Sequence, residues 1–144
     1  MDLLATAAEA ERLWCEVDRW SSFVEGFGSL VSGEGRWPDP GSIVVWDSTP
    51  HGRGRVQERV IERQPGLALA SEISEQRLSG TRWVRFNDIT DGESPGVRIE
   101  VQLDYRLSGS RWLRLPVDWL FVRPAVRASI ARELEQAAVQ LSPR

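Results

Sequence analysis

Few side chains in this sequence are suited to nucleophilic or acid–base catalysis. The single histidine, His51, has the residue type of a general base, but it lies in Pro50–Gly54, whose proline and glycines predict a hairpin turn. The single cysteine, Cys15, lies near Glu11 and Asp18, whose negative charges disfavour a reactive thiolate. Lysine is absent, since all 18 basic residues are arginine, and this excludes Schiff-base chemistry. We therefore expect His51 to be a solvated loop residue and Cys15 to be unreactive.

Glu58 is the best candidate for a catalytic acid or base. If Val56 and Val60 face the core, strand alternation places Glu58 between them on the same face, where a carboxylate needs a partner or a ligand. If the strand faces the other way, Ile61 points inward and Glu58 lies in solvent. Both orientations fit the sequence, so a catalytic role for Glu58 depends on which of them the fold adopts.

Metal, nucleotide and nucleic-acid sites are not predicted. One histidine and one cysteine cannot supply a zinc site with the usual ligands, and we expect no metal and no cofactor. Neither Gly33-Glu34-Gly35 nor Gly52-Arg53-Gly54 continues into a phosphate-binding loop ahead of a helix. The net charge is −3 and no run of arginine stands out on one predicted face, which argues against nucleic acid as a partner.

Aromatic residues are the main candidates for contacts with an apolar ligand. The chain has seven tryptophans and a single tyrosine. Trp46 and Tyr105 lie in predicted strands, where each could line a cavity with an apolar ring and a polar tip. Trp83 shares a strand face with Arg85, and we expect the two to stack at the surface. Trp14 falls on the apolar face of a predicted helix and is expected in the core.

The first elements of the chain are a short strand and a helix. The strand is expected within Asp2–Ala5. Thr6 and Glu9 then have the spacing of a capping box, with a hydroxyl at the cap and a carboxylate three residues later. Apolar residues at helical spacing follow, which predicts a helix with one buried face.

The middle of the chain alternates short apolar runs with glycine- and proline-containing turns, which predicts consecutive antiparallel strands. In the last run, apolar and polar residues alternate regularly, so one sheet face is expected to be buried. Arg82 and Asp88 share a strand face with Val84 and Phe86, and we expect a cross-strand salt bridge at the rim. Ser79-Gly80 is expected to be a turn. The expected strands are 30–33, 43–48, 55–63, 67–74, 81–89 and 97–107.

A long helical pattern covers Pro116–Leu141. Pro124 interrupts it, which predicts a short helix over Val117–Val122 and a restart at the proline. An antiparallel sheet with one apolar face needs a cover, and this is the one pattern long enough to supply it. Its apolar stripe is Trp119, Val122, Val126, Ile130, Leu134, Ala137 and Leu141.

Several stretches together carry a resemblance to a known family; they are Ala7–Trp14, Asp18–Trp20, Pro40–Trp46, Glu58–Glu62, Pro65 and Arg111–Leu141. In element order and pattern the chain resembles the helix-grip (START-like) superfamily, which includes polyketide cyclase/dehydrase and lipid-transport, coenzyme Q-binding and pollen-allergen-like proteins. The resemblance implies an α+β fold in which a curved antiparallel sheet of about six to seven strands wraps around a long C-terminal helix. It also implies a cavity between sheet and helix that holds an apolar small molecule.

Three functions are consistent with this resemblance. The first is binding of an apolar or amphipathic molecule, such as a lipid, quinone or polyketide-like compound. The second is a polyketide cyclase/dehydratase-type enzyme in which Glu58 assists aldol closure and dehydration. The third is membrane or protein docking through Arg111–Arg123, which includes Trp112. The expected ligand contacts are Trp46, Val56, Glu58, Val84, Phe86, Leu103, Tyr105, Ile130 and Leu134.

Length and hydropathy predict one soluble domain over residues 1–144. The start of the sequence lacks the basic residues and apolar run of a signal peptide, and no stretch of about 18 apolar residues could span a membrane. We expect a cytoplasmic protein.

Overall fold

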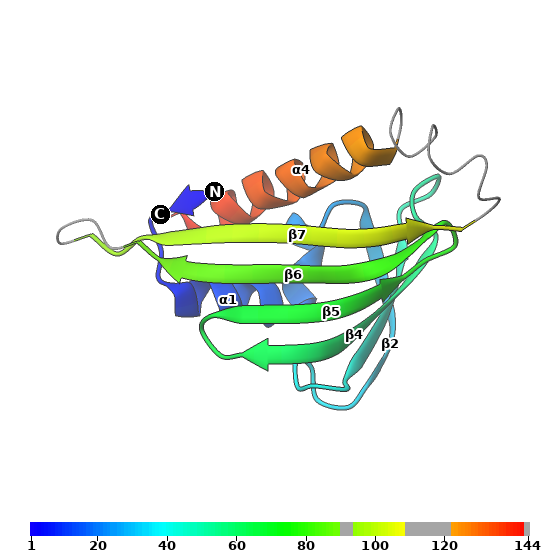
Figure 1. Cartoon of the computed structure of the whole chain (residues 1–144), viewed down its shortest axis with the longest axis horizontal. Coiled ribbons are helices and arrows are strands. Elements are labelled where there is room, and N and C mark those ends of the chain that lie inside the picture. Colours follow the sequence, from blue (N-terminus) through cyan, green and yellow to red (C-terminus); the bar gives the residue numbers. More distant parts are fainter. Residues whose placement is uncertain (90–93, 109–121, 143–144) are drawn as a thin grey trace.

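A computed structural model of the chain describes residues 1–89, 94–108 and 122–142, and shows a curved seven-stranded antiparallel sheet with helices on one face (Figure 1). The strand order is β1-β7-β6-β5-β4-β3-β2, so six consecutive strands pair as hairpins and the first strand pairs with the last. The predicted α+β class and antiparallel sheet are confirmed. The strands are β1 (Asp2–Leu3), β2 (Phe27–Glu34), β3 (Ile43–Ser48), β4 (Arg55–Gln64), β5 (Ala68–Ser74), β6 (Leu78–Asp88) and β7 (Val97–Leu107).

The first helix begins at the predicted capping box. The Thr6 hydroxyl accepts a hydrogen bond from the Glu9 backbone N–H at 3.2 Å, and the Glu9 carboxylate accepts one from the Thr6 N–H at 2.8 Å. Two otherwise unpaired amides are thereby satisfied. Helix α1 (Ala7–Cys15) follows, then a 3-10 turn (Val17–Arg19) and the short helix α2 (Trp20–Phe23).

One predicted turn is wrong, because Ser79 and Gly80 lie inside β6 rather than between strands. The chain turns earlier, over residues 75–77, where the Glu75 N–H donates to the Leu78 carbonyl. A Cβ added at Gly80 would collide with the Asp104 carbonyl oxygen and would lie 2.7 Å from the Tyr105 Cα. The glycine therefore allows the backbones of β6 and β7 to approach closely, and such close approach is a common reason for glycine inside a strand.

The C-terminal helix α4 (Arg123–Leu141) has Pro124 in its first turn, where the missing amide hydrogen costs no helical hydrogen bond. The predicted restart at the proline is confirmed, whereas the short helix over Val117–Val122 and Trp119 fall mostly outside the described residues. Ala137 is buried on the helix face toward the sheet, and Ile130 is half-buried. Glu133 is also buried on this face, so the predicted apolar stripe contains a carboxylate.

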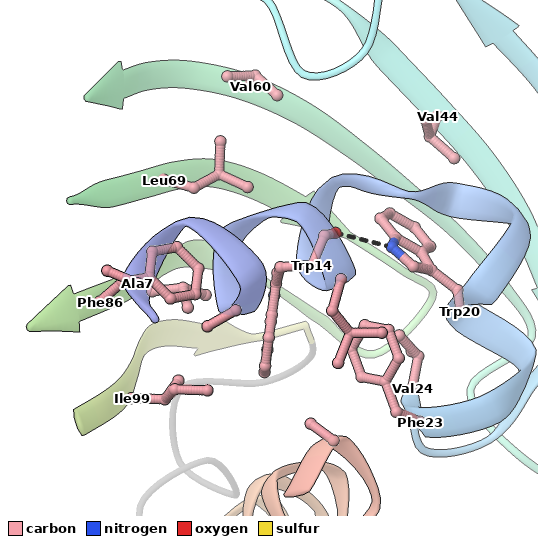
Figure 2. Close-up of a cluster of buried hydrophobic side chains, with 14 of the residues drawn as sticks. Ala7, Trp14, Trp20, Phe23, Val24, Val44, Val60, Leu69, Phe86 and Ile99 are labelled. Carbon is pink, nitrogen blue, oxygen red and sulfur yellow. Dashed lines mark hydrogen bonds between the residues drawn. The ribbon is translucent and has the colours of Figure 1, made fainter. Parts of the chain in front are cut away.

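The core is concentrated where α1 and α2 pack between the sheet and the C-terminal half of α4. Trp14 and Phe23 contact each other with ring centroids 5.1 Å apart, and the Trp20 indole N–H donates to the Trp14 carbonyl at 2.9 Å (Figure 2). Phe86 of β6 meets Trp14 edge to face. These aromatic side chains fill one half of the space between sheet and α4.

Candidate functional site

The other half of that space is a cavity of about 350 Å³ between β6, β7 and the N-terminal half of α4. It exists because α1 and α2 do not extend this far along the sheet. On the inner face of β7, Val97 and Ile99 are completely buried, whereas Val101 and Leu103 are only half-buried. The described lining is Arg53, Ile73, Glu75, Arg77, Leu78, Arg82, Val101, Leu103, Leu107, Val122, Ala125, Val126, Ser129, Ile130 and Glu133.

Three charged side chains from three elements meet at the buried end of this cavity. Arg82 of β6 donates to Glu58 of β4, with the Arg82 Nη2 2.8 Å from the Glu58 Oε2. The same guanidinium donates through Nη1 to the Glu133 Oε1 of α4, at 3.4 Å. All three residues are buried, with exposed fractions of 0% for Glu58 and 6% for both Arg82 and Glu133. We call these three residues the buried ionic cluster.

The buried ionic cluster corrects the expectation that Arg82 forms a salt bridge at the rim. Arg82 lies in the interior because the carboxylates of Glu58 and Glu133 compensate its charge there. Asp88, the other residue of that expectation, is exposed and accepts a hydrogen bond from the Ala7 N–H at 3.2 Å. Asp88 therefore helps to fix the start of α1.

Glu58 adopts the inward orientation, one of the two that the sequence allowed. It lies on the same face as Val56 and Val60, and all three side chains are buried. Glu58 is not among the described lining residues, so Arg82 stands between it and the cavity. The Glu58 Oε1 and the Arg82 Nε have no hydrogen-bond partner among the described residues.

Glu133 is the carboxylate of the cluster that lines the cavity. Burial raises its pKa above the ordinary value, and the nearby charges of Glu58 and Glu25 raise it further, whereas Arg82 and Arg53 lower it. The sequence interpretation missed this residue. Its signal was the spacing of three after Ile130 and four before Ala137, which places Glu133 on the covering face of the helix.

The β3–β4 and β5–β6 turns contribute further charged side chains to the cavity wall. Arg53, in the β3–β4 turn, has its Nε 2.5 Å from the Glu75 Oε2, and its guanidinium lies over the Trp46 ring at 5.4 Å. Arg77 is exposed at the cavity mouth and makes no ion pair within the described parts of the chain. The cavity thus has aliphatic walls with the buried ionic cluster at one end and arginines from the turns at the other.

The predicted ligand contacts divide into four groups. Leu103 and Ile130 line the cavity. Tyr105 lies with both of them in an adjoining hollow of about 450 Å³ between β7 and α4. Leu134 is half-buried against the core. The remaining residues, Trp46, Val56, Glu58, Val84 and Phe86, are completely or almost completely buried and do not appear in the described lining. Ligand contact by any of these residues stays a prediction.

The other residues considered for chemistry have the expected environments. His51 is exposed in the β3–β4 turn, with a φ of 65°. Burial, with a smaller contribution from Glu11, raises the pKa of the Cys15 thiol to about 12. The Arg85 guanidinium lies 5.8 Å from the Trp83 ring centroid, which confirms their stacking.

Within residues 1–89, 94–108 and 122–142, no group of three potential metal-ligating side chains gathers. None of the helices described there is long and apolar enough to cross a membrane. The segment predicted to dock, Arg111–Arg123, falls almost wholly outside the described residues.

The chain has the helix-grip fold, in which a curved antiparallel sheet is covered by a long C-terminal helix. No protein-family model and no curated protein matches it. A conserved protein from Geobacillus kaustophilus superposes with a TM-score of 0.75 at 9% identity, over 98% of this chain and 91% of that one. The di-domain ARO/CYC StfQ of the steffimycin biosynthetic pathway gives a TM-score of 0.70 at 17% identity, over 98% of this chain and 48% of StfQ. DynU16, from the dynemicin biosynthetic locus, gives 0.60 at 13% identity, over 98% of this chain and 45% of DynU16.

Proposed function

We propose that this chain binds an apolar or amphipathic small molecule, such as a lipid, quinone or polyketide-like compound, between the sheet and α4. The observation that carries the proposal is the cavity of about 350 Å³, which lies within the range of roughly 300–1,000 Å³ common for small-molecule sites. Its walls include the aliphatic side chains of Val101, Leu103, Val126 and Ile130.

Binding energy and orientation would come from different parts of this cavity. Burial of apolar surface supplies about 25 cal/mol for each Å² removed from water, which favours a chain or ring against the aliphatic walls. Arg82 and Glu133 supply polar groups at the buried end. A few polar groups within apolar walls fix the direction in which a ligand enters.

Filling the cavity with a side chain tests this proposal. Ser129 lines the cavity from α4, whereas Ala128, one residue earlier on the same helix, is exposed. Ser129→Phe is expected to abolish binding of 1-octanol, and Ala128→Phe, which adds an aromatic ring to the exposed side of the same helix, is expected to leave it unchanged. Titration calorimetry measures both. Equal binding by the two folded variants contradicts a ligand site at this place.

A second candidate function is acid–base catalysis of the polyketide cyclase/dehydratase type in the same cavity. It is favoured by Glu133, whose pKa is raised by burial and which lines the cavity beside Arg82. Two of the structural neighbours are linked to biosynthesis: StfQ is a di-domain ARO/CYC protein from the steffimycin biosynthetic pathway, and DynU16 belongs to the dynemicin biosynthetic locus.

Conservative variants of the two carboxylates separate binding from turnover. With a linear poly-β-keto thioester as substrate, Glu133→Gln should retain binding and lose turnover if Glu133 transfers a proton directly. Glu58→Gln tests the role predicted for Glu58 from the sequence. No turnover by the wild-type protein, with ligand binding intact, leaves the first function alone.

A further inference from the structure

The buried ionic cluster has one cation for two carboxylates, and the carboxylates share it unequally. The Arg82 guanidinium is 2.8 Å from Glu58 and 3.4 Å from Glu133. The shorter, better-formed contact is the one to Glu58, which is completely buried behind Arg82. Glu133, which lines the cavity, therefore has the weaker of the two ion pairs with Arg82.

Charged groups face Glu133 from several elements, but they include no second positive charge that is left uncompensated to pair with Glu133. Arg82 of β6 and Arg53 of the β3–β4 turn favour the carboxylate, whereas Glu58 of β4 and Glu25, just after α2, oppose it. Arg53 is itself paired with Glu75 of the β5–β6 turn. The last charge on the lining, Arg77, is exposed at the mouth. Burial is the largest influence, and it raises the pKa of Glu133.

With Glu133 protonated, the buried end of the cavity carries no net charge and presents donors. Glu58 and Arg82 neutralise each other, Glu133 offers its acid hydroxyl, and the Arg82 Nε–H has no acceptor among the described residues. A carboxylate entering here would lose its hydration without meeting an uncompensated cation, and an ammonium would meet Arg82. An uncharged oxygen can accept from these donors at no such cost.

We propose that the cavity binds an amphiphile by an uncharged oxygen end, hydroxyl or carbonyl, at Arg82 and Glu133, and that loading is coupled to uptake of one proton by Glu133. The proposal rests on the ligand-binding function proposed above. An apolar chain between Leu103 and Ile130 removes water from beside Glu133, which disfavours the charged carboxylate still more. Affinity is therefore highest at low pH and falls by up to tenfold per pH unit once Glu133 of the free protein ionises.

Calorimetric titration with 1-octanol between pH 5 and 9, in buffers that differ in ionisation enthalpy, tests the coupling. The wild type is expected to take up as much as one proton on binding and to bind more weakly as the pH rises. Glu133→Gln is expected to bind with constant affinity and no proton uptake. Glu135→Gln removes the same charge from an exposed position of the same helix and should behave as wild type.

The ligand class is tested at pH 6, toward the low-pH end of the range, where octanoate and octylamine are both charged in water, with three probes of equal chain length. 1-Octanol is expected to bind at least tenfold more tightly than octanoate or octylamine. Tighter binding of octanoate or octylamine overturns the choice of an uncharged oxygen. Binding of 1-octanol without proton uptake, and equally tight at all pH values, overturns the coupling. Both outcomes leave the proposed function intact, whereas failure of all three probes to bind at every pH contradicts it.

A measurement on the wild type keeps the coupling testable if Glu133→Gln does not fold. The carboxyl carbon of Glu133 can be titrated by NMR in the free and 1-octanol-saturated protein. The proposal requires the pKa of Glu133 to be higher in the complex. An unchanged value in the complex overturns it.

Discussion

Replacing Arg82 by methionine removes the single cation of the buried ionic cluster while keeping most of the side-chain volume. Glu58 and Glu133, with exposed fractions of 0% and 6%, are then left facing each other in the interior. Breaking a buried ion pair by removing one partner costs about 3–5 kcal/mol. For a domain of this size about 1 kcal/mol corresponds to 2–4 °C in the melting temperature, so we expect a decrease of roughly 6–20 °C.

The effect of Arg82→Met should depend on pH with a defined sign. Because the folded-state pKa of Glu133 is already raised above 4.5, the folded protein binds this proton more tightly than the unfolded chain does. Stability is then greatest below the unfolded value and is lost as the pH rises through the folded value. Without Arg82 this loss grows, so the variant should be impaired more at pH 8 than at pH 5.

Urea unfolding at pH 5 and pH 8 measures this effect. The control is Arg85→Met, which removes the same charge from an exposed position three residues along the same strand. Its stability should stay close to wild type. If Arg82→Met and Arg85→Met have the same unfolding free energy at pH 8, Arg82 does not compensate the buried carboxylates and the assignment of the cluster is wrong.

Two further predictions concern Gly80 and Cys15. Gly80→Ala places a methyl group against the Asp104 carbonyl and should lower the unfolding free energy by about 1–3 kcal/mol. The control is Gly66→Ala, where no atom lies within 4 Å of the added Cβ, so that only the strain of its positive φ should appear. Equal and small losses of unfolding free energy for the two variants in urea would mean that β6 and β7 do not approach each other as described. The thiol pKa of Cys15 is about 12 rather than 9.0, so the fraction of reactive thiolate at pH 8 is smaller in the native protein than in the unfolded chain. Cys15 should therefore react with a disulfide reagent at pH 8 about a thousandfold more slowly in the native protein than in urea. Comparable rates would show that the thiol is not buried.

Local patterns predicted the elements well, because each pattern lies within one stretch of chain. Alternation gave Val97–Leu107 the bounds that it has in the structure, and a short apolar run between turns did the same for Ile43–Ser48. The capping box at Thr6 and Glu9 placed the start of α1. Gly80 misled the prediction because glycine serves both turns and close strand crossings, and only the pairing of β6 with β7 distinguishes the two.

The candidate site was harder to predict because its contacts join distant parts of the sequence. Arg82 meets Glu58 across 24 positions and Glu133 across 51, and neither distance leaves a local signature. Alternation alone gave Glu58 two orientations. Trp46, expected at the cavity, is covered by the Arg53 guanidinium from the following turn. The cavity lies over the half of the sheet that α1 and α2 leave uncovered. Tertiary packing determines which half that is.

Methyl NMR of the wild-type protein with 1-octanol tests the central claim most directly, because it reports both binding and location. Saturable shift changes are expected at Val101, Leu103, Val126 and Ile130, together with contacts between ligand protons and these methyl groups. Methyl groups of Val56 and Val60, which lie in the closed core, should change little. Titration to the solubility limit of 1-octanol without saturable shifts at the four cavity residues would contradict the account.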